Sequence, residues 1–541
     1  MLSRPKYVSA LKGICRGVEK ESLRVTHDSR IAATSHPVSF GSPLTHDWIT
    51  TDYAEVQMEF ITPAGTDAEK TLAILADIHR HVYHHLDEEL LWPASMPCTI
   101  ESEEDIELAN YGDSNAGKIK TVYRQGLKNR YGSMMQVIAG VHFNFSMPDS
   151  FWPVWQQIKN DRQPLQDFIS ESYFGLIRNF LRLGWLVPYL FGASPAVDNS
   201  FLRSTRSTLP LQPIGRESHY LPMSTSLRMS DLGYNSKEQG NWSINYNSLP
   251  KFVKGLRQAV TTPNPVFEKI GVRQNGEYRQ LNSNILQMEG ELYGAIRPKQ
   301  VTRAGENLSC ALAARGVQYV EVRSLDINPY CATGVDLEQV YFLDIFLTYC
   351  LLQDSPELNL KQQAAAQRNL NKVATDGRKV SLELMDGETP RSLKSWGEDV
   401  FSDLTKVALT LDTVGQSEKY RAALDSQYQK LLNPALTLSA RIVADMAEQD
   451  LDFNELAVRL ARQHRQTLLG TEYQQLQEEE FAAEAASSLK RQKELEETQT
   501  LGFDDFLRLS LQGTLAGSVL SGEHSCQRPS MPDEQCDHCE Q

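Results

Sequence analysis

Two carboxylates separated by one lysine, on a segment typical of a β-strand, constrain this chain more than any other feature. Residues 17–24 have the sequence GVEKESLR. Side chains two apart on a strand point to the same face, so Glu19 and Glu21 share one face while Lys20 lies on the other. Neighbouring carboxylates repel each other and are not buried without compensation. The segment therefore predicts either a solvated face or a site for a hard ion such as Mg²⁺ or Mn²⁺.

Three further stretches are predicted to be strands with a polar face, at 51–62, 135–147 and 317–324. Their residues alternate between polar and apolar, as on a half-buried strand. The polar residues are Glu55, Gln57 and Glu59 on the first, His142 and Asn144 on the second, and Glu321 with Arg323 and Tyr319 on the third. Taken alone, His142 is better explained by a satisfied core histidine than by a ligand.

Much of the remaining chain has the apolar periodicity of helices, and from Asp336 onward it is predicted to be almost wholly helical. The first helix follows a cap at Thr66 or Asp67. The others are expected at 164–183, 249–260, 337–352, 358–373, 396–411, 416–432, 434–447 and 474–498. On the first helix His81 and His85 are four residues apart, a spacing that suits a zinc pair. The segment lacks the metalloprotease motif, which favours a polar flank of a packed helix instead.

Composition limits the classes of function. The formal net charge of -15 argues against nucleic-acid binding as the main activity, since neutralising phosphates needs a basic face. The first residues lack the apolar core of a signal peptide, and the most apolar run, 184–191, is too short to span a membrane. A cytoplasmic protein is expected, with no membrane, nucleic-acid or obligate protein partner. This expectation is compatible with a monomer.

The C-terminal residues differ from the rest. Residues 513–541 are rich in Gly, Ser and Pro and are predicted to form a disordered tail. It contains Cys526, Cys536 and Cys539, and this cysteine spacing suits a zinc or redox site as well as an unstructured thiol-bearing tail. Residues 1–512 are expected to form one domain, sheet-rich over 1–330 and helical over 331–512.

The charged residues together suit a polyphosphate bound through metal ions. Carboxylates would hold the ions, while Arg228, Arg297, Lys299, Arg303 and Arg323 would hold phosphate oxygens. The chain contains neither the Gly-rich phosphate loop of P-loop proteins nor the dinucleotide-binding fingerprint. A nucleotide would therefore bind through carboxylate-held ions on a sheet.

Long motifs in a fixed order resemble bacterial glutamate–cysteine ligase (γ-glutamylcysteine synthetase), type 1. The resemblance runs from about Leu11 to about Phe503. Besides GVEKESLR, it rests on WITTD (48–52), SMPC (95–98), GLKNRYG (126–132), GVHFNFS (140–146), YLFGASP (189–195), SLRMSDLGY (226–234), RPK (297–299) and YVEVRSLDINP (319–329).

The resemblance implies a fold and an activity. The fold is α+β, a funnel-like, mostly antiparallel sheet similar to that of glutamine synthetase and surrounded by helices. The activity is ATP-dependent ligation of the γ-carboxylate of L-glutamate to the amine of L-cysteine, through γ-glutamyl phosphate. This reaction is the first step of glutathione biosynthesis. Mg²⁺ or Mn²⁺ is the implied cofactor, and ATP is a co-substrate.

The resemblance also implies roles for individual residues. Glu321 and Arg323 are expected to be catalytic. The metal ligands would be Glu19, Glu21, Asp52, Glu59, His142 and Glu321, and the ATP phosphates would meet Arg323, Arg297 and Lys299. The pocket for cysteine and glutamate would be formed by Tyr53, Tyr123, Leu127, Gln136, Arg228, Tyr234 and Tyr293. Tyr53 stands where the family pattern has Phe, which would add a hydroxyl.

Two alternatives remain at this point. One is a related carboxylate–amine ligase with another amine acceptor, and the pocket residues argue against it. The other is a non-catalytic metal- or nucleotide-binding protein on the same fold, which the loss of a carboxylate from the set would favour. No carboxylate of the set is missing.

Overall fold

The computed structural model describes residues 5–205, 207–233, 242–303 and 305–513. Tyr234 and the C-terminal cysteines of the predicted tail lie outside these residues. The described chain combines antiparallel sheets with many helices, which confirms the predicted α+β class. Within the described residues, no helix is both long and apolar enough to cross a membrane.

The sheet that carries the acidic strands has seven strands in the described residues, and its pairings are antiparallel. Strand β4 pairs with β1 away from the main path. In spatial order the strands are β11 (Ile296–Lys299), β12 (Tyr319–Leu325), β5 (Val141–Ser146), β1 (Cys15–Val25), β3 (Gln57–Ile61) and β2 (Ile49–Thr51), with β4 at Leu90–Leu91.

The strand register brings the predicted polar faces together. Glu19 of β1 lies opposite His142 of β5, and Glu21 lies opposite Glu59 of β3. On the other side of β5, Glu321 of β12 lies opposite Asn144. Directly opposed residues of antiparallel strands share a face. The acids of β1, β3 and β12, with His142 and Asn144 of β5 between them, therefore form one continuous polar patch across four neighbouring strands.

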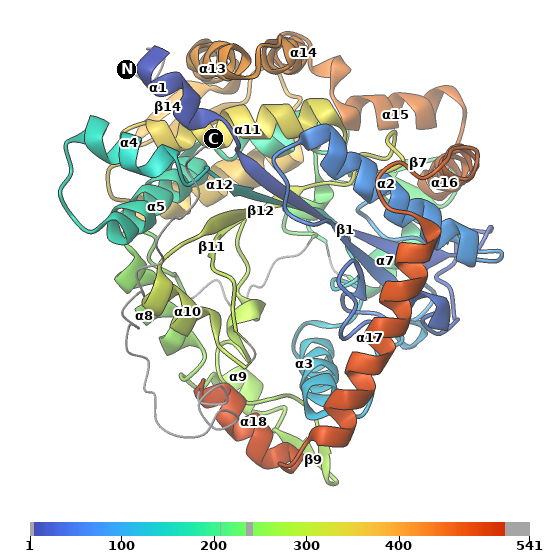
Figure 1. Cartoon of the computed structure of the whole chain (residues 1–541). Coiled ribbons are helices and arrows are strands. Elements are labelled where there is room, and N and C mark those ends of the chain that lie inside the picture. The colour runs from blue at the N-terminus through green and yellow to red at the C-terminus, as the bar shows by residue number, and fades with distance from the viewer. Residues whose placement is uncertain (1–4, 206, 234–241, 304, 514–541) are drawn as a thin grey trace.

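Helices surround this sheet, and Figure 1 shows α11, α13 and α14 stacked above it while α3 and α17 lie on the other side. The longer helices are α2 (Ala68–His85), α3 (Asn115–Tyr131), α4 (Phe151–Lys159), α5 (Leu165–Leu183), α8 (Leu249–Ala259), α10 (Leu308–Arg315), α11 (Leu337–Leu352), α12 (Leu360–Asp376), α13 (Leu393–Gly415), α14 (Lys419–Leu432), α15 (Leu438–Glu448), α16 (Phe453–Leu469), α17 (Glu478–Thr498) and α18 (Phe503–Gln512). The shorter ones are α1 (Pro5–Val8), α6 (Leu186–Phe191), α7 (Asn199–Ser204) and α9 (Pro265–Glu268).

Small sheets and single 3-10 turns complete the described chain. The small sheets are formed by β6 (Ala196–Asp198), β7 (Gln212–Ile214) and β8 (Ser218–Tyr220), by β9 (Arg273–Gln274) with β10 (Glu277–Tyr278), and by β13 (Glu383–Asp386) with β14 (Thr389–Ser392). The turns are Ser9–Leu11, Val38–Phe40, Glu103–Asp105, Leu227–Met229, Glu289–Glu291 and Pro434–Leu436.

One predicted strand is wrong in part, because 51–62 is interrupted by a turn between β2 and β3. Glu55 lies in that turn and does not join the acidic face. Its buried carboxylate accepts hydrogen bonds from the backbone N–H groups of His36 at 2.9 Å and Asn110 at 2.8 Å. Likewise, the strand predicted at 135–147 begins only at Val141.

A buried ion pair fixes the first residues of β1 against the helical layer. Arg16 donates from Nη2 to Asp344 Oδ2 at 2.7 Å and from Nε to Oδ1 at 3.2 Å, and both side chains are almost completely buried. Asp344 belongs to α11, so the pair connects the acidic strand to a helix more than 300 residues away in the sequence.

Helix α17 runs beside α3 and supports its N-terminal end (Figure 1). The backbone N–H of Asp113 donates to Glu496 at 3.0 Å, and that of Asn115 donates to the side chain of Gln499 at 2.8 Å. The Asn115 side chain also donates to the carbonyl oxygen of Leu501 at 2.8 Å. Residues near the end of the described chain thus position a helix near its beginning.

Lys20 lies on the face of β1 opposite to the acids and is buried in the core. Its ammonium group is 5.7 Å from the centre of the Phe60 ring, and its stem lies against Gly334. Burial lowers the pKa of Lys20 from 10.5 to about 7. A buried ammonium group with no carboxylate among its principal neighbours costs stability wherever it must be charged.

We expect Lys20→Met to remove part of the pH dependence of stability. Between pH 7 and 10.5 the unfolded chain holds a proton that Lys20 releases on folding, so the free energy of unfolding rises with pH. The slope contributed by one such group is ~1.4 kcal/mol per pH unit. Urea unfolding in metal-free buffer between pH 7 and 9 measures it. The exposed Lys254→Met is the control, and equal slopes in wild type and Lys20→Met would contradict the assignment.

Candidate active site

A cavity of about 260 Å³ lies over the acidic face of the sheet. All the residues that the resemblance assigns to the site line it except Arg297 and Tyr234, the latter lying outside the described residues. Arg303, also predicted to hold phosphate, does not line it. Its walls are Glu19, Glu21, Asp52, Tyr53, Glu59, Tyr123, Arg124, Leu127, Gln136, Ile138, His142, Arg228, Met229, Gly290, Tyr293, Gly294, Ala295, Lys299, Glu321 and Arg323. Side chains from widely separated parts of the chain therefore meet in one place.

His142 stands at the centre of the acidic patch. Its Nδ1 is 3.2 Å from Glu19 Oε2 and 3.5 Å from Glu321 Oε1, and its Nε2 is 3.5 Å from Glu21 Oε1. Asn144 donates to the second oxygen of Glu19 at 2.8 Å. One imidazole thus faces three carboxylates, an arrangement that a core histidine without a functional role does not need.

The carboxyl groups of the patch differ in their affinity for protons. Burial raises the pKa of Glu21, and burial together with the nearby Asp52 and Glu19 raises the pKa of Glu59 well above its usual range. Burial acts in the same direction on Glu321, but the charges of Arg323 and Lys299 outweigh it and hold that pKa well below its usual range. Glu321 is therefore the more acidic of these carboxyl groups, and Glu59 has the higher affinity for a proton.

Cations lie at one edge of the patch. Arg323 Nη1 donates to Glu321 Oε1 at 3.1 Å, and Lys299 Nζ is 3.3 Å from Glu321 Oε2. Arg297 lies opposite Glu321 on the neighbouring strand β11 and is buried, outside the cavity wall. Its charge still lowers the pKa of Glu321. The edge combines an ionised carboxylate with guanidinium and ammonium groups, the side chains that bind phosphate oxygens.

Arg228 is held in the wall by a backbone carbonyl and a buried carboxylate. Its Nη2 donates to the carbonyl oxygen of Arg323 at 2.8 Å, and Nη1 is 3.6 Å from Asp326 Oδ1. Gly140 packs directly against the guanidinium, since a Cβ at that position would lie 2.2 Å from Nη2. Asp326 is itself buried and accepts from the hydroxyl of Ser194 at 2.6 Å. The guanidinium is therefore fixed in place before any ligand arrives.

The apolar and aromatic residues predicted for the amino-acid pocket line the other side of the cavity. The hydroxyl of Tyr53 is 2.9 Å from Ser133 Oγ, so the group that distinguishes this residue from Phe has a partner inside the protein. Tyr123 and Leu127 come from one face of α3, and Tyr293 comes from the segment before β11.

Sequence reasoning missed Arg124, which also lines the cavity. Its Nε donates to the carbonyl oxygen of Asp52, and its guanidinium lies over the ring of Tyr111. Lys120, one turn earlier, lies over the same ring, and burial lowers its pKa to about 8. Helical spacing of Lys120, Tyr123, Arg124 and Leu127 was the available signal, but this segment had not been predicted to be a helix.

Comparison with known proteins agrees with this geometry. Residues 1–373 match the family described as glutamate-cysteine ligase. The chain belongs to the glutamate–cysteine ligase family. A ligase of this family from Serratia proteamaculans is 47% identical over 501 residues, covering 92% of this chain and 96% of the relative. Another, from Erwinia tasmaniensis, is 48% identical over 502 residues with the same coverage.

Solved structures support the glutamate–cysteine ligase fold. The crystal structure of glutamate–cysteine ligase from Francisella tularensis in complex with AMP has a TM-score of 0.87 and 32% identity, covering 93% of this chain and 98% of that one. A bifunctional glutathione synthetase from Pasteurella multocida has a TM-score of 0.70 at 23% identity and shares the fold. The predicted sheet of glutamine-synthetase type is confirmed by the first of these matches. The chain is accordingly an ATP-dependent ligase that forms γ-glutamylcysteine.

Proposed function

We propose that the cavity over β1, β3, β5 and β12 is where this ligase joins L-glutamate to L-cysteine at the expense of ATP. One observation carries the proposal: His142, Glu19, Glu21 and Glu321 converge within 3.2–3.5 Å contacts beside Arg323. Carboxylates for ions, cations for phosphate and a small aromatic pocket then border a single volume. In this proposal, each residue that the family resemblance assigns to the site has the role that the resemblance implies.

The donor set suits Mg²⁺ or Mn²⁺. Glu19, His142 and Glu321 have ligand atoms within 4.8 Å of one another, and Glu21, Glu59 and Asp52 lie around the same cavity. Oxygen-rich sets of this kind favour hard divalent ions, with Mn²⁺ tolerating the imidazole better than Mg²⁺. When bound, such ions would neutralise ATP and polarise its terminal phosphate. The raised pKa of Glu59, caused by burial and by the nearby carboxylates, supports a site that binds positive charge.

The reaction needs positioning more than a protein nucleophile. The γ-carboxylate of glutamate attacks the terminal phosphorus of ATP, and the bond to ADP breaks to leave γ-glutamyl phosphate. The cysteine amine then attacks the acyl carbon, and phosphate leaves as the amide forms and the amine loses a proton. Arg323 and Lys299 are placed to hold phosphate oxygens, and Arg228 is placed to hold an amino-acid carboxylate.

A second cavity, next to the first, is large enough for part of a nucleotide. It has a volume of about 600 Å³ and shares Tyr293, Gly294 and Ala295 with the first. Its other walls are mainly apolar and include Leu292 and Ala364. We infer that the base and ribose of ATP occupy this second cavity while the phosphates reach the acidic patch, since nucleotide bases prefer apolar walls with few polar groups.

The proposal places the reaction in the cytoplasm, in a chain that acts as a monomer. Its thiol substrate must stay reduced, as thiols do in that compartment. The cysteines of the described residues agree, because Cys15, Cys98, Cys310, Cys331 and Cys350 are all free thiols.

An assay of phosphate release tests the function. The full chain is mixed with ATP, Mg²⁺ and L-glutamate, with and without L-cysteine. We expect phosphate release that depends on cysteine, and a product with the mass of γ-glutamylcysteine. Release that depends on another amine and not on cysteine would assign a different acceptor. Turnover that persists without any added divalent ion, in the presence of a chelator, would contradict the metal assignment.

A further inference from the structure

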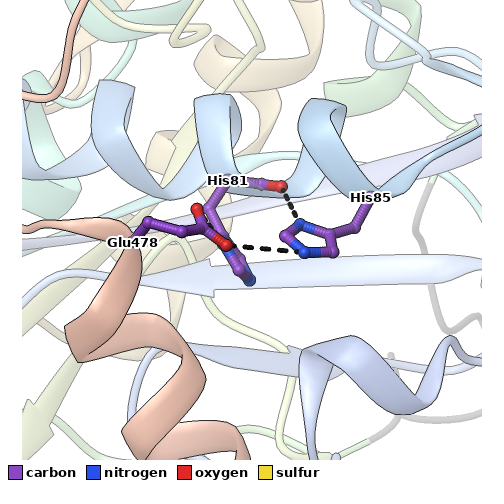
Figure 2. A group of neighbouring side chains, drawn as sticks. All are labelled: His81, His85 and Glu478. Atoms are coloured by element: carbon purple, nitrogen blue, oxygen red, sulfur yellow. Dashed lines mark hydrogen bonds and ion pairs between the residues drawn. The ribbon is translucent and has the colours of Figure 1, made fainter.

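A second cluster of metal-type side chains lies far from the acidic patch, between α2 and α17. Figure 2 shows His81 and His85 on one face of α2 and Glu478, the first residue of α17, reaching toward both. His81 Nδ1 is 3.1 Å from Glu478 Oε2, and His85 Nε2 is 3.4 Å from Glu478 Oε1. The three residues offer ligand atoms that all lie within 4.8 Å of one another.

The hydrogen bonds of His85 leave a lone pair facing a carboxylate. Its Nδ1 is 3.0 Å from the carbonyl oxygen of His81, and a carbonyl can only accept, so the proton of the neutral ring is on Nδ1 (Figure 2). Nε2 then points an acceptor at Glu478 Oε1, itself an acceptor. A proton or a metal cation must lie between them, and the separation of 3.4 Å exceeds the usual range for a hydrogen bond.

The spacing agrees with metal ligation. Bonds of 2.0–2.1 Å at tetrahedral angles place two ligand atoms about 3.3 Å apart. His81 and His85 lie 3.1 and 3.4 Å from different oxygens of Glu478, so each histidine–carboxylate pair, taken singly, has the spacing of two ligands of one ion. Histidine pairs at i and i+4 with a carboxylate are a common zinc set, and a ring N–H bonded to a backbone carbonyl is the usual way such a ligand is oriented.

We propose that His81, His85 and Glu478 bind a zinc-class divalent cation, with water as its fourth ligand. The open side suits this coordination, because the side chains of His85 and Glu478 are 31% and 42% exposed while His81 is buried. The surroundings hold the ligands in place. His81 stacks on Phe481 with ring centres 4.4 Å apart, and the hydroxyl of Tyr473 donates to Glu478.

The ion would join two helices that meet only after the chain has folded. Glu478 begins α17, which continues past Gly41 and reaches the start of α3 through Glu496. The bound cation would therefore anchor α17 at one end, and through it support the helix that carries Tyr123 and Arg124 of the active site. It would stabilise the fold by binding the folded state alone.

Zinc titration of the metal-free full chain tests the proposal. Excess Mg²⁺ is present to occupy the acidic patch, and a Cys526→Ser/Cys536→Ser/Cys539→Ser background removes the three thiols of the C-terminal residues. We expect one equivalent of Zn²⁺ to bind by calorimetry and to raise the thermal unfolding midpoint. His85→Gln and Glu478→Gln should each weaken binding at least tenfold and abolish the shift in midpoint. Co²⁺ in place of Zn²⁺ should give the visible absorption of a four-coordinate site.

Matched controls make the outcome decisive. His84→Gln and Glu479→Gln change exposed neighbours of the same two helices and should leave binding unchanged. The side chains of His85 and Glu478 are partly exposed, so their substitution should not disturb the fold. Circular dichroism verifies that each variant is folded. The proposal is overturned if the wild-type background binds no equivalent of Zn²⁺, or if binding survives unaltered in both His85→Gln and Glu478→Gln.

Discussion

Glu321→Gln is expected to lower kcat for cysteine-dependent phosphate release by ~10²–10³-fold, the effect of removing one preorganised charge at the reacting centre. Glu321 is buried, ionised and in contact with His142, Arg323 and Lys299. A neutral amide of the same shape would leave those three groups facing less negative charge and would weaken the binding of divalent ions. Steady-state kinetics over a range of Mg²⁺ concentrations measures both effects.

The control for this substitution is Glu383→Gln, which makes the same chemical change on the exposed strand β13. It should leave kcat within experimental error of the wild type. Thermal unfolding of the Glu321→Gln variant establishes that the sheet is intact. Activity within twofold of the wild type at saturating Mg²⁺ would remove Glu321 from the proposed site.

Asp344→Ala is expected to lower the free energy of unfolding by ~3–5 kcal/mol, the usual result of removing one partner from a buried ion pair. The substitution leaves the Arg16 guanidinium buried without its carboxylate, and Tyr420 loses an acceptor as well. Chemical denaturation at constant pH measures the change. Because Arg16 begins β1, we also expect the variant to lose activity at temperatures where the wild type is stable.

Two comparisons identify the cause. The double variant Arg16→Met/Asp344→Leu removes both charges and should recover most of the lost stability, since well-packed apolar pairs replace buried ion pairs at little cost. At the surface, Lys159 and Asp354 form an exposed pair at 3.2 Å, and Asp354→Ala should cost less than ~1 kcal/mol. A loss in Asp344→Ala no larger than in Asp354→Ala would mean that the buried pair does not fix β1.

The strands of the site were predictable because their charged residues recur at every second position, which is the period of a strand. Glu19 and Glu21 on β1, and Glu321 and Arg323 on β12, each lie two residues apart, and the structure places both pairs on strands. The same reasoning failed at Glu55. Alternation of polar and apolar residues continues through the turn between β2 and β3, so the pattern alone could not show where pairing stops.

Helix α3 was not predicted, because its sequence resembles a loop at its start. Ser114 caps it, and glycines at 117 and 126 weaken the helical signal. The structure explains both: a Cβ on Gly117 would lie 2.3 Å from the carbonyl oxygen of Tyr111, and one on Gly126 would lie 2.0 Å from the side chain of Gln287. Gly117 makes room for the loop just before the helix, Gly126 makes room for a distant segment, and such contacts leave no periodic trace in a sequence.

The sequence pattern alone could not show that the residues of the site lie close together in space. Nothing in the spacing of Glu19, His142 and Glu321 indicates that β5 lies between β1 and β12. Strand order depends on long-range packing and was expected only from the family resemblance. The cluster of His81, His85 and Glu478 is a similar case, since its third member lies almost 400 residues from the first two.

The support of α3 by residues 496–501 has a consequence for the order of events during synthesis. Every residue that lines the proposed catalytic cavity has left the ribosome well before the segment that holds the start of α3 is made. A nascent chain can therefore pair its acidic strands early and still lack a fixed wall for its amino-acid substrates. Catalytic activity would therefore appear late, in one step, when the last helices pack against α3. A chain truncated before residue 496 should bind divalent ions yet turn over poorly.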